Sequence, residues 1–220
     1  MTGACARRAI KLCAIVALTI PVVACSPKAP DYQSILGTTA ATTTTTTAVK
    51  PVPLSQYLES IGVTGQQVAP STLTDLSVSI PTPAGWSQFT NPNIRPETVL
   101  IAKGGKYPTA RLVVFKLRGD FDPAQVIKHG NDDAQLFENF KQLDASTAPF
   151  NGFPSSMIQG SYDLDGTRLH SWNQIVIPTG SPPANQRYLV QLTITSLADQ
   201  AAAQSTDIET IIRGFVVAAK

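Results

Sequence analysis

The chain has 220 residues, of which 43% are hydrophobic and 15% are charged, and it carries three cysteines and two histidines. This length accommodates one or two domains. The 17 lysines and arginines nearly balance the 15 aspartates and glutamates, so no nucleic-acid-binding surface is indicated and no nucleic-acid partner is expected.

The N-terminus has the pattern of a lipoprotein signal peptide. Three cations within residues 1–11 precede an apolar run at 12–23, which is shorter than the roughly 20 residues that span a bilayer. The run ends in Val22-Val23-Ala24-Cys25, a lipobox pattern. We therefore expect cleavage after Ala24, diacylglycerol and an acyl chain such as palmitate on Cys25, and an extracytoplasmic domain held to the membrane. The alternatives are an uncleaved anchor and an ordinary secretory signal.

Cleavage changes the charge and the cysteine content. Residues 1–24 hold three of the 17 cations and no acid, so 14 lysines and arginines would remain against 15 acids. They also hold two of the three cysteines, which leaves Cys25 without a disulfide partner. Acyl chains rather than basic residues would then hold the protein to the membrane, and the domain would depend on its hydrophobic core for stability.

Residues 25–50 are predicted to be a tether. They include six consecutive threonines and little apolar surface, so ordering them would cost more entropy than burial returns. A flexible coil of ~25 residues spans about 25–30 Å. This distance is enough to hold a domain clear of the membrane surface.

Residues 51–220 are predicted to form a single globular domain. Apolar spacing and turn residues predict three helical regions, of which the second is interrupted, and two groups of strands. The expected helices are 54–61, 123–143 and 199–213, with Leu136, Phe137, Phe140 and Leu143 on one stripe of the second, and the expected strands are 76–80, 98–103, 110–117, two runs flanking 165–166, and 187–195.

The strongest local signal is a hairpin turn at Asp165-Gly166, between two alternating runs. A two-residue loop there pairs Asp163 with Arg168, Tyr162 with Leu169, and Ser161 with His170. Asp122-Pro123 is a second clear signal, because aspartate caps a helix and proline suits its first position.

The order of elements predicts an α+β fold, an antiparallel sheet with helices packed on both faces in an α/β/α sandwich. The strand at 110–117 is apolar on both sides, which predicts a central position covered twice.

Catalytic and metal-binding patterns are missing from the sequence. There is no G-x-S-x-G motif, and Ser155-Ser156 lacks the strand–turn–helix context of a nucleophile. His129 and His170 stand 41 positions apart, with no metal-ligand spacing around either. We expect no enzyme activity, no catalytic residue, no metal and no cofactor.

One face of the predicted hairpin is a candidate binding surface for a sugar or polar lipid headgroup. A tryptophan there lies among hydrogen-bonding side chains, and the alternative is that Trp172 packs under a helix. Trp86, which follows Pro83-Ala84-Gly85, is predicted to fill the core. The candidate residues are Gln159, Ser161, Asp163, Arg168, His170, Trp172 and Gln174.

Four segments resemble the mycobacterial LpqN/LpqT lipoprotein family and contain no catalytic motif. They read VSIPTPAGW at 78–86, NPNIRPETVLIAKG at 91–104, FKLRGDFDPAQVIKHG at 115–130 and NGFPSSMIQGSYDLDGTRLHSWN at 151–173. The resemblance implies a PsbP-like α/β/α fold on a lipidated tether, in the envelope of a mycolate-containing bacterium. It also implies roles in envelope lipid biology, transport of mycolate glycolipids and host recognition, and it transfers the acylated cysteine to Cys25.

We therefore expect a monomeric, non-catalytic accessory protein that binds an envelope lipid, a glycolipid or a membrane-transporter domain. One alternative is a host-interacting lipoprotein whose acylated N-terminus is the ligand of a host receptor. A hydrolase or transferase is the lesser alternative.

Overall fold

The structure, a computed structural model, describes residues 50–220, which form one compact unit. This unit holds its own hydrophobic core, as a domain that folds alone must. No helix within the described range is long and apolar enough to cross a membrane. The signal-peptide and lipidation predictions at Ala24 and Cys25, and the tether at 25–49, lie outside the described residues.

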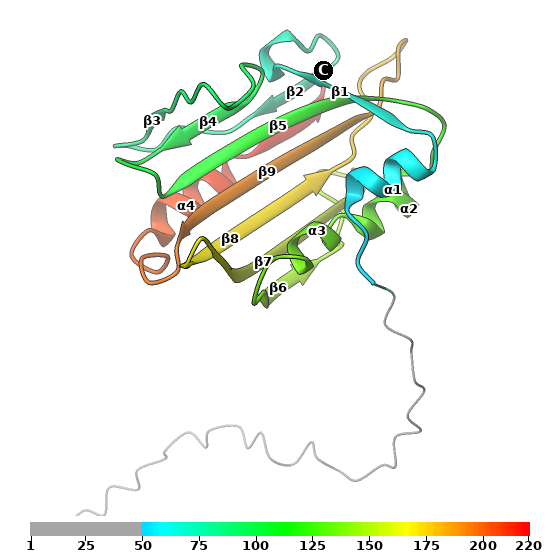
Figure 1. Ribbon diagram of the computed structural model, residues 1–220. Helices are drawn as coiled ribbons and strands as arrows, with labels where there is room; N and C mark the ends of the chain where they lie inside the picture. Colours follow the sequence, from blue (N-terminus) through cyan, green and yellow to red (C-terminus); the bar gives the residue numbers. More distant parts are fainter. Residues whose placement is uncertain (1–49) are drawn as a thin grey trace, which may run out of the picture. The chain divides into compact units, whose positions relative to one another are not determined.

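An antiparallel sheet of eight strands forms the centre of the domain (Figure 1). The ten residues of β5 are long enough for two neighbours on one edge: β4 pairs with its first part and β1 with its last part. The order across the sheet is β3 (Ser87–Gln88), β4 (Val99–Ala102), β5 (Thr109–Arg118), β9 (Tyr188–Leu197), β8 (Thr167–Val176), β7 (Ser155–Leu164) and β6 (Lys141–Ser146), with β1 (Thr64–Val68) beside β5.

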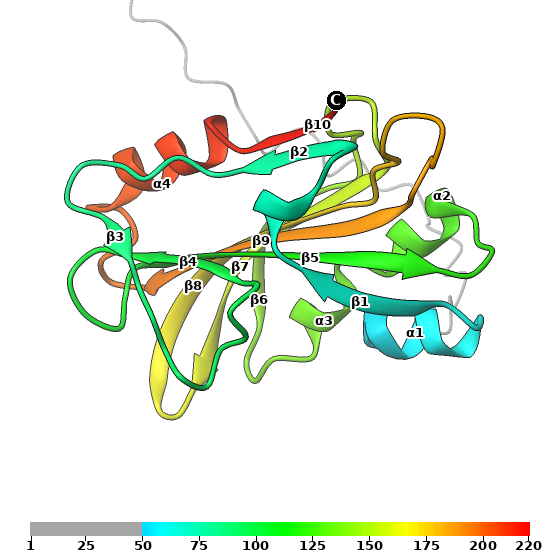
Figure 2. The ribbon, with the colours of Figure 1, turned by 90° about the horizontal axis from the view of Figure 1, so that it is seen from above.

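One face of this sheet is closed by the main core. Figure 2 shows helix α4 (Ser205–Arg213) and the two-stranded sheet of β2 (Leu76–Ser79) and β10 (Val216–Ala219) lying together over that face. Ile208 and Ile211 of α4 pack in the same cluster as Trp172. Burying a side chain of this size contributes about 1.5–3 kcal/mol, so this face supplies most of the apolar driving force.

The opposite face is covered at one end only. Short helices α1 (Leu54–Ser60), α2 (Pro123–Val126), η3 (Ile127–His129) and α3 (Asp132–Gln135) gather there (Figure 1). A smaller core beneath them includes Leu54 and Leu58 of α1 with Ile175 and Leu189 of the sheet. The predicted α+β fold with helices on both faces is therefore confirmed, although the coverage is uneven.

Local signals in the sequence were accurate. The β7–β8 hairpin has the predicted register of Asp163–Arg168, Tyr162–Leu169 and Ser161–His170. Asp165 and Gly166 both have positive φ, as a two-residue turn of this kind requires. The Asp122 carboxylate accepts a hydrogen bond from the Ala124 N–H at 2.8 Å and caps α2, as predicted.

Three predictions were wrong in detail. The helical stripe through 136–143 fails because Asn139 has a φ of +51°, which interrupts the helical run, and Leu143 lies exposed in edge strand β6. The last helix begins at Ser205 rather than Asp199. Strand β5 is central but not covered twice, because Phe115 and Val113 on its second face are only half-buried. That second face borders a cavity.

Candidate functional site

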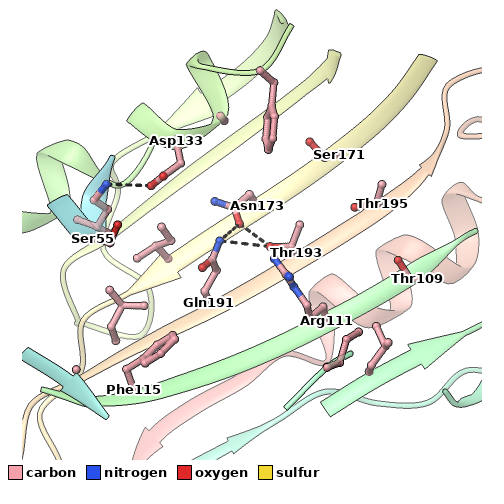
Figure 3. Close-up of a pocket in the computed structure, with 18 of the residues that line it drawn as sticks. Ser55, Thr109, Arg111, Phe115, Asp133, Ser171, Asn173, Gln191, Thr193 and Thr195 are labelled. Carbon is pink, nitrogen blue, oxygen red and sulfur yellow. Dashed lines mark hydrogen bonds between the residues drawn. The ribbon is translucent and has the colours of Figure 1, made fainter. Parts of the chain in front are cut away.

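A cavity of about 1300 Å³ lies on the half-covered face of the sheet. Its walls come from segments far apart in the sequence: α1 and α3 on one side, and the loops at 89–94 and 105–107 on the other. The floor is formed by β5, β9 and β8, whose side chains project into it in Figure 3.

Polar residues lie in register across three strands at one end of this floor. Thr193 of β9 pairs with Arg111 of β5 on one side and with Asn173 of β8 on the other. Thr195 is paired in the same way with Thr109 and Ser171, which gives a second polar row beside the first. Alternate residues of a strand share a face, so both rows open into the cavity.

Hydrogen bonds connect part of this polar floor (Figure 3). The Asn173 side-chain oxygen accepts from Gln191 Nε2 at 2.9 Å and from the Thr193 hydroxyl at 2.8 Å. Both bonds use the amide oxygen and leave the Asn173 amide nitrogen available to donate. The side chains are therefore fixed in a defined orientation, and the Asn173 amide offers a donor to the cavity.

The other end of the floor is apolar. Phe115, Leu117, Leu189 and Ile175 line it, and Leu58 of α1 closes it. Arg111 and Leu117 are six residues apart on β5, a distance of about 20 Å along a strand. The floor of the cavity is therefore amphipathic along its length, polar at one end and apolar at the other.

Aromatic side chains stand at the rim of the cavity. Phe89 and Phe137 are each about two-fifths exposed, at 39% and 44%. Phe137 stacks on Tyr162, with ring centroids 4.3 Å apart. Burial and the nearby Tyr107 raise the pKa of Tyr162, while hydrogen bonding to Thr195 and the charge of Arg111 lower it. The phenol of Tyr162 is thus neutral and can donate a hydrogen bond inside the cavity at neutral pH.

Hydrogen bonds between α3 and the start of α1 hold the apolar end in place. Helix α1 has no side-chain cap of its own, because its N-cap residue is Pro53. Asp133 supplies the missing acceptor from 79 positions away and accepts from the Leu54 N–H at 3.0 Å. Asp132 accepts from the Val52 N–H at 3.3 Å and contacts His129 Nδ1 at 2.9 Å.

The predicted binding face lies on the other side of the sheet. Its residues do share one face of the hairpin, as the register requires, but Trp172 is buried in the main core with Ile208 and Ile211. Trp172 therefore packs under helix α4, the alternative that its sequence position also allowed. Trp86 is likewise buried in that core, as predicted, and its Nε1 donates to Asp207 at 3.1 Å.

The polar groups of that face bond to one another. Arg168 forms an ion pair with Asp163 at 3.0 Å, and Gln159 Nε2 lies 2.9 Å from His170 Nε2. Burial lowers the pKa of His170, so its imidazole is neutral at pH 7. Buried Gln174 donates to the Ser156 carbonyl oxygen. Whether this face binds a ligand stays a prediction, and the cavity offers the larger open surface.

Among the described residues, no hydrogen bond joins a candidate serine nucleophile to a histidine. Ser155 and Ser156 are buried, His129 stacks on Tyr57, and His170 contacts Gln159. Within 50–220 no three side chains of histidine, cysteine, aspartate or glutamate gather in a group that could hold a metal ion.

Sequence reasoning missed the cavity residues, although one signal was present. Gln191, Thr193 and Thr195 alternate with apolar residues along β9, a pattern that indicates one wetted face. Arg111 stands at an alternate position of β5 and points to the same side. The positions of α1 and α3, which turn that face into a cavity, leave no comparable trace in the sequence.

The fold and the site together define an α+β domain whose antiparallel sheet is buried on one face and holds an open amphipathic cavity on the other. The chain belongs to the LpqN family of mycobacterial envelope lipoproteins, because the family model "Probable lipoprotein LpqN" matches residues 50–218. The family indicated by the four sequence segments is thus confirmed.

Relatives support this assignment over nearly the whole chain. Putative lipoprotein LpqT of Mycobacterium leprae (strain TN) is 75% identical over 207 residues, which cover 94% of both chains. Putative lipoprotein LpqT of Mycobacterium tuberculosis (strain ATCC 25618 / H37Rv) is 65% identical over 208 residues, covering 94% of this chain and 92% of that one.

A solved structure shows the same fold. The crystal structure of LpqN, described as involved in cell envelope biogenesis of Mycobacterium tuberculosis, superposes with a TM-score of 0.65 at 18% identity, covering 77% of this chain and 99% of that one. The cyanobacterial PsbP of Synechocystis sp. PCC 6803 gives a TM-score of 0.42 at 12% identity, covering 66% and 94%.

Proposed function

We propose that this lipoprotein is a non-catalytic accessory protein of the envelope that binds a lipid or glycolipid in the cavity. The single observation that carries the proposal is the amphipathic floor, with Arg111 and Asn173 at one end and Leu189 and Phe115 at the other. An acyl chain prefers the apolar end and a headgroup prefers the polar end, so one amphiphile satisfies both.

The size of the cavity supports this class of ligand. Ligand pockets for drug-sized molecules have volumes of ≈300–1,000 Å³, and this cavity, at about 1300 Å³, is larger. Each methylene buried contributes about 0.8 kcal/mol, so even part of an acyl chain gives substantial affinity.

A binding role is also favoured over catalysis by the lining itself. Neither His129 nor His170 lines the cavity, and the two lining acids that could act as a base, Glu59 and Asp133, belong to α1 and α3 rather than to the strands that carry the hydroxyl rows. Nucleophilic catalysis requires such a base within hydrogen-bond reach. The proposal therefore assigns the cavity to holding a ligand rather than to transforming it.

The proposal is tested by blocking the apolar end. Gly65 of β1 lines the cavity, and a Cβ placed on it would have ordinary contacts of 3.5 Å with Leu117 and Phe115. Gly65→Phe should therefore fold and fill space that an acyl chain would use. If the ring displaces three methylene groups, binding weakens by about 2.4 kcal/mol, or about 50-fold.

A matched control places the same ring on the other face of the same strand. Gln66 is exposed and does not line the cavity, so Gln66→Phe should bind like the parent. The measurement is calorimetric titration of residues 50–220 with single-chain amphiphiles of twelve carbons, neutral and anionic, below their micelle concentrations. Failure of every amphiphile to bind, or equal affinities of the two variants, would refute the proposal.

Membrane attachment through Cys25 is part of the same proposal. Anchoring would raise the local concentration of the domain near lipids and membrane partners, among them a transporter domain. The full-length protein should sediment with the membrane fraction, and the Cys25→Ala variant should appear in the soluble fraction. The host-receptor alternative depends on the same residue: receptor signalling that persists in Cys25→Ala would exclude the acylated N-terminus as its ligand.

A further inference from the structure

Arg111 carries a charge at the polar end of the cavity that the described part of the chain does not neutralise. Its side chain is exposed, and within residues 50–220 its guanidinium has neither an ion pair nor a hydrogen bond. Other arginines of the domain, such as Arg168 and Arg187, do have carboxylate neighbours. Five N–H donors in a planar fork thus face the cavity without an acceptor.

One further nitrogen donor lies close to Arg111. Thr193 and Asn173 lie in register beside it across β9 and β8, and Figure 3 shows the nitrogens of Arg111 directed toward Thr193. The oxygen of Asn173 already accepts two hydrogen bonds, so its amide nitrogen is the group left for a ligand. The nitrogen donors of Arg111 and Asn173 therefore complement a group that accepts hydrogen bonds.

Charges along the cavity are separated by sign. Lys106 belongs to the loop that leads into β5, close in sequence to Thr109 at the polar end, and it lies 5.5 Å from the Tyr107 ring centroid. The acids of the lining, Glu59 and Asp133, belong to α1 and α3 at the apolar end. Asp133 is already engaged as the cap of α1.

We propose that the cavity selects an anionic amphiphile, whose carboxylate or phosphate binds Arg111 and Asn173 while its chain runs toward Leu189. Guanidinium forks bind both oxyanions bidentately. The inference rests on the proposed lipid-binding function and specifies the headgroup, because the proposed function alone is equally compatible with a neutral glycolipid.

The experiment compares headgroups on one chain length. Residues 50–220 are titrated by calorimetry with laurate, lauroyl lysophosphatidate and neutral 1-lauroylglycerol. The two anions should bind at least about 10-fold more tightly than the neutral ester, because a hydrogen bond to a charged group contributes more than a hydrogen bond between neutral groups. The tighter of the two anions identifies carboxylate or phosphate as the natural group.

Variants locate the effect. Arg111→Gln should weaken both anions about 10- to 100-fold and leave 1-lauroylglycerol unchanged. Arg118→Gln, which removes the same charge from the same strand at an exposed position outside the cavity, should bind like the parent. Asn173→Asp keeps the oxygen that Gln191 and Thr193 donate to, and it should reject anions by repulsion.

The outcomes separate this inference from the proposed function. Equal affinity for neutral and anionic amphiphiles, or an anion preference that survives in both Arg111→Gln and Asn173→Asp, overturns the anionic headgroup and leaves lipid binding intact. Absence of binding to all three amphiphiles overturns the proposed function itself.

Discussion

Asp133 caps a helix that is distant from it in sequence, and removing its carboxylate tests how the apolar end of the cavity is held. In Asp133→Ala the Leu54 N–H loses its acceptor at 3.0 Å, while Pro53 at the N-cap position offers no side-chain replacement. Loss of an N-cap costs about 1 kcal/mol, within a range of 0.5–2. The carboxylate also interacts favourably with the helix dipole, which places the cost in the upper part of that range.

The packing of α1 against the sheet limits the effect of losing its cap. Leu54 and Leu58 of α1 are buried, at 4% and 8% exposure, and each contributes about 1.5–3 kcal/mol. Because this exceeds the cost of the lost cap, α1 should stay docked in Asp133→Ala. A loss of 1 kcal/mol lowers the melting temperature of a domain of this size by about 2–4 °C. At a cost of about 1.5–2 kcal/mol, amide exchange in α1 should become about 10- to 30-fold faster.

The measurement combines thermal unfolding with hydrogen exchange resolved to α1. Asp120→Ala is the matched control, because the Asp120 side chain is fully exposed and would lose only its 4.0 Å ion pair with Arg187. Exposed pairs of this kind contribute between 0 and 1 kcal/mol. If Asp133→Ala and Asp120→Ala have the same stability and the same α1 exchange rates, the hydrogen bond from α1 to Asp133 does not stabilise the helix.

Three further predictions concern the stability of the domain. Gly160→Ala should destabilise it by about 1–3 kcal/mol in urea unfolding, because a Cβ there would lie 2.5 Å from Phe140 Cε2 and 2.7 Å from the Lys141 carbonyl oxygen. Gly105→Ala is its control and should leave the unfolding free energy unchanged, because a Cβ at that position would have no atom within 4 Å. Leu192→Ala should cost about 2–5 kcal/mol, because Leu192 is fully buried, whereas exposed Leu143→Ala should change the unfolding free energy by less than about 0.5 kcal/mol. Burial lowers the pKa of His170, so the folded state binds fewer protons than the unfolded chain, and the stability present above pH 6.5 is lost as pH falls through the lower, folded pKa. His170→Gln should flatten the part of this decline that begins below pH 6.5, whereas Asp163 and Asp207, whose pKa values are lowered from 3.8, contribute to the decline only at lower pH. A pH profile identical to that of the parent would contradict the assignment.

Local chemistry made part of this fold predictable. The Asp165-Gly166 turn and the Asp122 cap depend on a few adjacent residues, and the structure has both as predicted. The short strands β1 and β3 were not predicted, because their five and two residues have no apolar alternation and they form through pairing with β5 and β4. Whether such a segment forms a strand depends on its tertiary pairing, which a sequence pattern does not show.

The candidate site was predictable only in part for a related reason. Alternation identifies which residues share a face, and it placed Gln159, His170 and Trp172 together correctly. It does not identify which face a helix will cover. Helix α4 covers the face of Trp172, so the tryptophan that suggested a ligand platform became core, and the uncovered face of Thr193 became the cavity floor.

The polar rows also oppose closure of the cavity by the 89–94 loop. Closing the 89–94 loop over the floor would bury Arg111 and the free amide of Asn173 against apolar rim residues such as Phe89. Each buried polar group left without a partner costs about 1–3 kcal/mol, and an unpaired charge costs more. An amphiphile that supplies both a hydrogen-bonding headgroup and an apolar chain gives these groups partners and so removes that cost. The residues that keep this end of the cavity from collapsing are therefore the same residues that would select the headgroup.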